Sequence, residues 1–252
     1  MKYKRPTAPF FSRVGGKTRL AAKLVKMIPE HDTYVEPFIG GGAVFFKKEP
    51  SNKEVINDKD KLVYNLYRDM RSTGDRVKDM DFRCSRKIFQ TAQNSKATTP
   101  FRRLHQNLII VKHSYSAIGK SYMGDKSCVQ GRGSVKNVKA SGWRYKERLK
   151  NVIIRNQDWK TVARRYDSPK TFFYFDPPYM TKKGTWGYDA MAPAEIARLL
   201  KKLKGKWILS YENTPEMTKL FRSAKYTTRR VRHVYELSGQ RQNVTEVVIR
   251  NF

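Results

Sequence analysis

Acidic residues and cysteines are the scarce components of this 252-residue sequence. It contains 22 Asp plus Glu against 53 Lys plus Arg, a formal net charge of +31 at pH 7, and only two cysteines, Cys84 and Cys128. The cysteines are far apart in the sequence, with no CxxC pair and no histidine cluster near them. We therefore expect neither a zinc site nor a disulfide framework, and a reducing, intracellular setting fits.

Long apolar runs are also missing. No stretch of about 18 apolar residues occurs, so we expect no segment that spans a bilayer. The N-terminus, MKYKRPTAPFFSR, is basic but lacks the apolar core and small residues of a secretory signal. These absences predict a cytoplasmic protein, in a bacterial cell or a virus-infected host cell, with no membrane partner.

The excess of positive charge predicts an anionic partner. Each Lys or Arg placed on a phosphate releases condensed counterions, so nucleic acid is the partner that this composition favours. A cationic surface without a partner and an anionic membrane remain alternatives. The charge is concentrated between Arg102 and Lys150, where Asp125 and Glu147 are the only acids.

Short apolar strands alternate with helical patterns at both ends of the chain, which predicts an α/β fold with a mostly parallel sheet flanked by helices. Between residues 59 and 156 the sequence pattern differs. A helical pattern comes first, and residues 112–139 are rich in Lys, Ser, Gly and Tyr with little apolar periodicity. This region reads as a surface-borne insertion. The expected strands are 33–37, 55–58, 171–175, 207–210 and 244–249, and the expected helices are 20–28, 43–46, 62–70, 194–203 and 215–221.

Two glycine motifs are candidate ligand sites. VEPFIGGG places Gly40, Gly41 and Gly42 between a strand and a helix, and Asp58 ends the next strand, where open α/β sheets place an acid on ribose hydroxyls. An adenosine-containing ligand is therefore expected. The second motif, RVGGKTRL, is no phosphate-binding loop of the GxxxxGK[ST] type, because Phe11 stands where glycine is required. Lys17 is still a candidate ligand contact.

The segment FFYFDPPY, residues 172–179, ends an apolar strand in an acid, two prolines and an aromatic ring. Ligands bind outside the carboxyl ends of parallel strands, so these side chains are expected to face the cleft. The Asp176 carboxylate and the Pro177 carbonyl offer two acceptors to a group with two protons, such as an exocyclic amine. Tyr179 offers a flat face on which a base can stack.

These motifs, in this order, resemble the Dam-like family (D12 class, alpha group) of S-adenosylmethionine-dependent DNA adenine-N6 methyltransferases. The GGK motif, VEPFIGGG, Asn57-Asp58, Gln157-Asp158-Trp159 and DPPY each match a motif of that family, over nearly the whole chain. The chain departs from the family at Ser12-Arg13, where Lys-Trp is usual, and in the recognition hairpin. The target sequence is therefore not predicted.

The resemblance implies a Rossmann-like methyltransferase domain, residues 1–58 and 157–252. It also implies a mainly helical target-recognition insert with a hairpin or loop, residues 59–156. The expected catalytic residues are Asp176, Pro177, Pro178 and Tyr179. The expected cofactor contacts are Phe11, Gly15, Lys17, Glu36, Pro37, Phe38, Gly40, Gly42, Asp58, Asp158, Trp159 and Asp176. The expected nucleic-acid contacts are Arg102, Arg103, Lys112, His113, Ser114, Tyr115, Lys120, Tyr122, Lys126, Arg132, Lys136 and Lys139.

The implied reaction is methyl transfer from S-adenosylmethionine to adenine N6 in double-stranded DNA, after the base flips into the cleft. No metal is expected, because the sulfonium is already a strong electrophile, and we expect a monomer or a weak dimer. A restriction-modification role fits this family. The alternatives are methylation of RNA adenine, of cytosine N4 or of a protein amide, and a nucleic-acid-binding protein that keeps the fold but does not catalyse.

Overall fold

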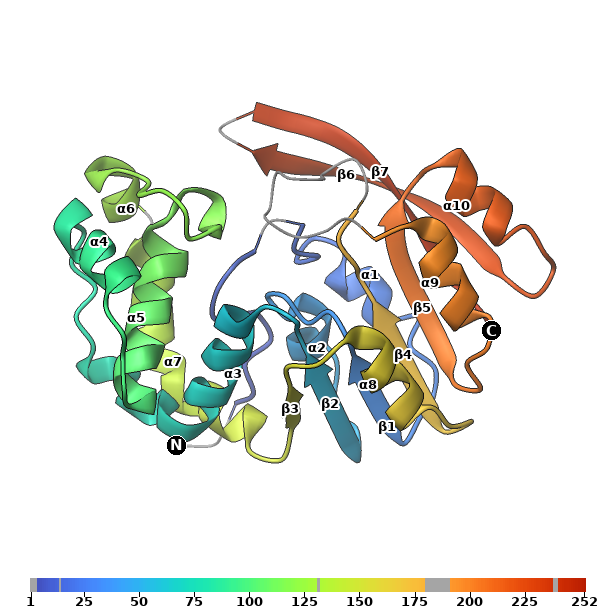
Figure 1. The fold of residues 1–252 in the computed structure, drawn as a ribbon, viewed down its shortest axis with the longest axis horizontal. Coiled ribbons are helices and arrows are strands. Elements are labelled where there is room, and N and C mark those ends of the chain that lie inside the picture. Colours follow the sequence, from blue (N-terminus) through green and yellow to red (C-terminus); the bar gives the residue numbers. More distant parts are fainter. Residues whose placement is uncertain (1–3, 14, 131, 180–190, 238–239) are drawn as a thin grey trace. The chain divides into compact units, whose positions relative to one another are not determined.

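A seven-stranded sheet is the framework of the computed structural model, which describes residues 4–13, 15–130, 132–179, 191–237 and 240–252 (Figure 1). The strand order is β3-β2-β1-β4-β5-β7-β6. This order confirms the predicted Rossmann-like α/β fold. The strands are β1 (Thr33–Glu36), β2 (Lys53–Asn57), β3 (Ile153–Arg155), β4 (Thr171–Phe175), β5 (Lys206–Glu212), β6 (Thr227–Leu237) and β7 (Gln240–Arg250).

The central strands are parallel and β7 is not. β1 pairs in parallel with β2 and with β4, and β4 pairs in parallel with β5. β7 runs antiparallel to both β5 and β6. The strand order reverses between β1 and β4, which makes the carboxyl ends of these two strands the topological switch point, where open α/β sheets bind ligands.

Strand β4 forms because its sequence suits a position buried on both faces. All five residues of TFFYF are buried, as expected for a central parallel strand. The rings of Phe173 and Phe175 stack with centroids 5.6 Å apart, and Phe172 packs against Tyr34 of β1 at 6.0 Å. The prolines that follow Asp176 have no N–H to continue the ladder, so the strand ends there.

The helices carry most of the remaining chain, and the expected strands and helices of the two chain ends are found within a few residues of their predicted bounds. Residues 112–139, where little apolar periodicity was found, contain α6 and the first part of α7. The helices are α1 (Ala21–Val25), α2 (Ala43–Lys47), α3 (Lys61–Thr73), η1 (Gly74–Asp79), α4 (Arg86–Asn94), α5 (Pro100–His113), η2 (Tyr115–Ala117), α6 (Asp125–Gln130), α7 (Arg132–Leu149), α8 (Trp159–Tyr166), α9 (Pro193–Leu200) and α10 (Pro215–Leu220).

The chain divides into two compact units. The first comprises residues 1–22, 40–49 and 60–156, and the second comprises residues 23–39, 50–59 and 157–252. The first unit is mainly helical and contains a short hairpin: Ser114 and Tyr122 form an antiparallel bridge, and Tyr115 N donates to Ser121 O. The second contains the strands of the switch point. Among the described residues, no helix is long and apolar enough to cross a membrane.

Aromatic rings form the core of the first unit. Phe10 lies 5.4 Å from Tyr67 and 5.2 Å from Tyr145, measured between ring centroids. Phe46 of α2 packs against the same two tyrosines, at 6.3 and 5.4 Å. These contacts join the N-terminal segment to α2, α3 and α7, so residues before the GGK motif pack with the helical region.

Cys84 and Cys128 form a disulfide in the structure, so the expectation of no disulfide was wrong. They are 44 residues apart in the sequence, but their Cα atoms are separated by 5.8 Å because α4, α5 and α6 fold back on one another. Sequence spacing alone does not report this approach, since neither cysteine belongs to a local motif.

Reduction of this disulfide should destabilise the protein. A cross-link that closes a loop of this length restricts the unfolded chain and contributes about 4 kcal/mol. We expect a phosphine reductant, with chelator present, to lower the urea midpoint of unfolding by this free energy divided by the denaturant slope m. The Cys84→Ser/Cys128→Ser variant serves as the control, because its midpoint should not respond to the reductant. An unchanged wild-type midpoint would contradict the prediction.

Candidate active site

Polar residues follow both strands of the switch point. β1 ends in Glu36 and continues into Pro37 and Phe38, while β4 is followed by Asp176 and Pro177. Because β1 and β4 are parallel neighbours, these segments leave the same edge of the sheet. The Asp176 side chain is half-buried and Pro177 is buried. The predicted acid therefore stands at the place where this fold binds ligands.

A buried tyrosine and a second carboxylate accompany Asp176. The Tyr179 hydroxyl lies 3.1 Å from Asp176 Oδ1 and 2.9 Å from Glu246 Oε1. Glu246 belongs to β7 and is fully buried. A phenol has a single proton to donate, so the hydroxyl serves one carboxylate at a time. Glu246 was not recognised from the sequence, because β7 is remote from the DPPY motif along the chain.

The Tyr179 ring is mostly covered. Only 7% of the residue is exposed, and its ring centroid lies 5.1 Å from that of Tyr211. Stacking of a base on this ring, as expected from the sequence, requires the ring to be uncovered. Its hydroxyl, to which the sequence analysis assigned no role, orients the Asp176 carboxylate in the structure.

Two further tyrosines, Tyr34 and Tyr174, form hydrogen bonds in the same part of the sheet. The Tyr34 hydroxyl donates to Glu36 Oε2 over 2.6 Å, and Tyr174 lies 3.0 Å from Ser210 Oγ. Burial raises the pKa of both tyrosines well above the usual value, and the charges of Glu36 and Asp176 raise it further. Both phenols therefore stay protonated. Glu36, predicted as a cofactor contact, is 2% exposed and has Tyr34 as a hydrogen-bond donor.

Asn57, the last residue of β2, joins two loops at this edge. Its Nδ2 donates to Pro37 O over 2.9 Å and lies 3.1 Å from Gln157 O, and its Oδ1 accepts from Gln157 N over 2.9 Å. The residue is 1% exposed. The amide thus fixes the loops after β1 and before α8 beside Asp58, the half-buried acid predicted to meet a ribose.

Aromatic side chains flank these loops. Phe38 and Trp159 face each other with centroids 5.5 Å apart, and Trp159 meets Phe175 edge-on at 6.2 Å. Phe38 is half-buried and Trp159 is 5% exposed. Asp158, predicted as a cofactor contact, caps α8 through a bond from Lys160 N to its Oδ1. Its structural role is therefore helix capping.

The two glycine motifs pack together within the first unit. A Cβ on Gly41 would approach Phe11 O to 3.2 Å, and the Tyr67 hydroxyl donates to Gly40 O over 3.1 Å. Gly40 and Gly42 have φ of 46° and 76°, backbone conformations that residues other than glycine rarely adopt. Lys17, 4% exposed, donates to Gly15 O over 2.8 Å.

The predicted nucleic-acid contacts fall into two groups. The first group reaches the surface: Arg102, Tyr115, Lys120, Lys126 and Lys136 are exposed, and Tyr122 is half-buried. The second group is engaged in the fold. Arg103 forms a bidentate ion pair with the buried Asp69, and Lys139 donates to Met80 O. His113 and Ser114 are 1% and 0% exposed. The side chain of Arg132 lies outside the described part of the chain.

Lys112, a predicted nucleic-acid contact, has a perturbed pKa. Burial lowers its pKa from 10.5 to about 8. The unfolded chain then binds more protons than the folded one between pH 8 and 10.5, so stability from this group rises with pH over that window.

We expect Lys112→Met to raise the free energy of unfolding at pH 7, by up to roughly 3 kcal/mol, and to remove the rise above pH 8. Urea unfolding at several pH values measures this. Lys120→Met, on an exposed residue, should follow the wild-type profile. An identical pH profile in Lys112→Met and wild type would contradict the assigned shift.

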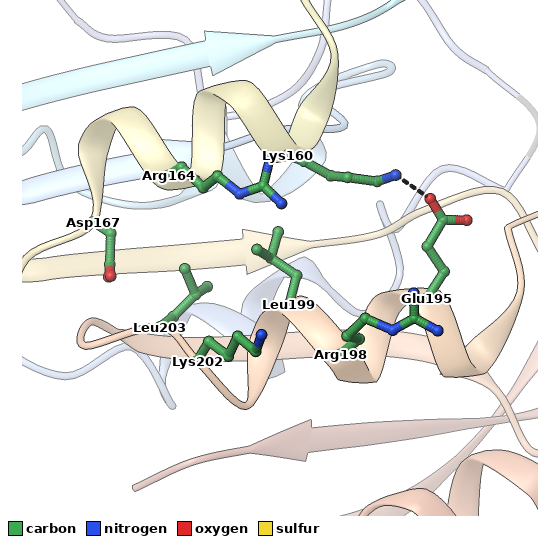
Figure 2. A pocket seen from close by; sticks show the side chains of 8 residues that line it. All are labelled: Lys160, Arg164, Asp167, Glu195, Arg198, Leu199, Lys202 and Leu203. Atoms are coloured by element: carbon green, nitrogen blue, oxygen red, sulfur yellow. Dashed lines mark ion pairs between the residues drawn. The ribbon is translucent and has the colours of Figure 1, made fainter.

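A surface pocket of about 360 Å³ lies between α8 and α9 (Figure 2). Its walls are mostly charged, and Lys160 and Glu195 form an ion pair of 2.5 Å across it. Trp159, Ile196 and Leu200 of these helices are buried, whereas most residues that line the pocket are exposed or half-buried, and none of them belongs to the segment that carries Asp176. We do not assign it to the chemistry of Asp176.

The strand order, with acids at the carboxyl ends of β1, β2 and β4, is that of an open α/β protein, a class that binds ligands at the switch point of the sheet. The family model of D12 class N6 adenine-specific DNA methyltransferases matches residues 14–235. The chain belongs to this family, and its activity is S-adenosylmethionine-dependent methylation of adenine N6 in DNA. The predicted family is thereby confirmed.

Curated relatives span nearly the whole chain. The chain is 25% identical over 280 residues to a type II methyltransferase of Lactococcus lactis subsp. cremoris, covering 97% of this chain and 95% of the relative. It is 25% identical over 272 residues to a type II methyltransferase of Paramecium bursaria Chlorella virus NC1A, covering 97% and 99%. It is 22% identical over 261 residues to the DNA adenine methylase of Escherichia coli K12, covering 95% and 93%.

Proposed function

We propose that Asp176 and the Pro177 carbonyl hold the exocyclic amine of an adenine that has been flipped out of duplex DNA. The observation that carries this proposal is the position of Asp176, half-buried directly after β4 at the switch point of the sheet. The bound amine has two protons, and the two acceptors satisfy both. This geometry turns the nitrogen lone pair away from the base, towards the methyl donor.

Tyr179 and Glu246 position the acceptor. The Tyr179 hydroxyl bonds to Asp176 Oδ1, which limits rotation of the carboxylate. Glu246, on the other side of the hydroxyl, is fully buried and competes for the same proton. When the phenol turns to Glu246, Asp176 has its full acceptor capacity for the amine. Tyr179 and Glu246 therefore let Asp176 exchange its hydrogen bond from the phenol for one from the substrate amine as the substrate enters.

The chain also fits an adenosine-containing cofactor. Gly40 has a left-handed conformation, and a Cβ there would meet nothing within 4 Å, so open space adjoins the backbone at this position. Asp58 is placed to accept from ribose hydroxyls, and Phe38 with Trp159 offers an apolar contact for a purine. We include Pro37, Gly42, Phe11, Gly15 and Lys17 among the contacts. When bound, S-adenosylmethionine supplies an electrophilic methyl group.

The basic helical region is proposed to bind the DNA. Residues 59–156 serve as the target-recognition part, and residues 1–58 and 157–252 serve as the catalytic part. Exposed cations contact phosphates, which positions the duplex without reading its sequence. We further propose that the protein acts in the cytoplasm as a monomer or weak dimer. Because two of its relatives are type II methyltransferases, we also propose a restriction-modification role. The proposed contacts are Arg102, Tyr115, Lys120, Tyr122, Lys126 and Lys136.

Incubation with unmethylated genomic DNA and labelled S-adenosylmethionine tests the proposal. Nucleoside analysis should find N6-methyladenine, and single-molecule mapping should place it in a defined sequence context. Parallel reactions with single-stranded DNA and with RNA test the requirement for a duplex. Label in N4-methylcytosine, or in RNA but not in DNA, would overturn the assignment of the substrate.

A further inference from the structure

A cluster of three metal-ligating side chains lies in the first unit, among residues that the methyl-transfer chemistry does not use. Cys84, His113 and Cys128 each offer a ligand atom, and these atoms all lie within 4.8 Å of one another. Cys84 precedes α4, His113 ends α5 and Cys128 belongs to α6. Three separate elements therefore converge on one point, although each residue is remote from the others along the chain.

The composition of the cluster exceeds what a disulfide needs. Two cysteines suffice for the bond between Cys84 and Cys128. The imidazole of His113, 1% exposed, adds a third ligand of a type that favours the same metals as thiolate does. Two sulfurs and one imidazole nitrogen form the Cys₂His set found in zinc sites.

The burial of the three residues also suits a metal site. Cys128 is 3% exposed and His113 is 1% exposed, whereas Cys84 is half-buried. Cys84 is thus the most exposed of the three residues. An ion can enter beside Cys84, and water can hold the remaining coordination position from that side.

We propose that the reduced cluster of Cys84, His113 and Cys128 binds a single thiophilic divalent ion of the zinc class. Reduction by a dithiol breaks the disulfide, gives two thiols and leaves the dithiol oxidised to its own disulfide. As the ion binds, both thiols lose their protons to solvent and neutral His113 donates a ring nitrogen. Disulfide and metal exclude each other, because both use the same two sulfurs.

The metal would hold a defined segment of the first unit. His113 O accepts from Met123 N over 2.9 Å, which closes the hairpin that follows α5. Cys128 lies just beyond this hairpin. A bond from the metal to each side of it therefore fixes residues 114–127 in the reduced protein, whereas the disulfide of the oxidised protein ties Cys128 to Cys84 alone. The inference is independent of the proposed methyl transfer.

Cobalt binding to the full chain tests the site. The protein is reduced with a phosphine, stripped with a chelator, desalted without oxygen and titrated with Co²⁺. We expect thiolate-to-cobalt charge-transfer absorption and the d–d bands of tetrahedral Co²⁺, saturating at one ion per chain and abolished by Zn²⁺. Zn²⁺ should also protect both cysteines from a thiol reagent. Reduced wild-type protein without the charge-transfer band, or with both thiols still reactive in Zn²⁺, would overturn the proposal.

Matched histidine variants test the third ligand. His113→Gln should weaken Co²⁺ binding by more than about a hundredfold. Loss of a residue that only hydrogen-bonds to a metal ligand already lowers metal affinity by up to about that factor, and His113 is itself a proposed ligand. His105→Gln, on the same helix but outside the cluster, should bind Co²⁺ as wild type does. Wild-type affinity and bands in His113→Gln would refute the Cys₂His assignment. The wild-type titration needs no variant, so a variant that fails to fold leaves the proposal testable.

Discussion

Asp176→Asn should lose methyl transfer while the protein stays folded and keeps its ligands. The amide has nearly the shape of the carboxylate, but it carries no charge and presents an N–H₂ group to the substrate amine. We expect kcat to fall roughly a thousandfold, the middle of the range for one positioned proton acceptor. Single-turnover assays with labelled cofactor measure the step directly, and equilibrium binding of DNA and S-adenosylmethionine should change little.

Asp32→Asn is the matched control for this experiment. Asp32 precedes β1, at the opposite end of the strands from Asp176, and its side chain is 54% exposed. The substitution is chemically identical and should leave turnover unchanged. If Asp176→Asn methylates DNA at the wild-type rate, the carboxylate has no part in the reaction and the proposed site is wrong.

Tyr179→Phe separates the two roles that Tyr179 can have. Phenylalanine keeps the ring, so stacking with a base survives, but the hydroxyl that orients Asp176 is lost. A hydrogen bond to a charged group contributes about 1.5 to 3 kcal/mol, so we expect kcat to fall about tenfold to a hundredfold. Steady-state kinetics on a methylatable duplex gives the value, and KM for DNA should remain near wild type.

Tyr226→Phe provides the comparison. Tyr226 packs against Trp207 with centroids 5.8 Å apart, and removing its hydroxyl should not affect catalysis. Full activity in Tyr179→Phe would show that the ring alone matters. A fall in DNA affinity without a fall in kcat would instead assign Tyr179 to binding.

The strands that build the site were predictable from the sequence because each is a short apolar run that ends in a residue of special chemistry. TFFYF followed by DPPY and TYVE followed by Pro37 both carry this signal, and the structure places strands at both. Their adjacency follows from the sheet order, which no local pattern encodes. The acids could therefore be named in advance, whereas their shared edge had to be observed.

Glu246 and Asn57 were missed for related reasons. Glu246 lies within a strand and looks like an ordinary charged residue until β7 is found beside β5. Asn57 was noted only as the neighbour of Asp58, although its side chain holds the surrounding loops. The disulfide was missed because its partners come together only when three helices are packed. Contacts that are distant along the chain leave little trace in a single sequence.

Asn57 also exposes the protein to chemical ageing. Hydrolysis of its amide to a carboxylate would replace the donor Nδ2 with an oxygen that faces two backbone carbonyl oxygens. A contact that now fastens the loops would become a repulsive one. Burial shields the amide while the chain is folded, so damage would accumulate in molecules that have opened. A molecule that aged while open would then be unable to restore the edge of its sheet.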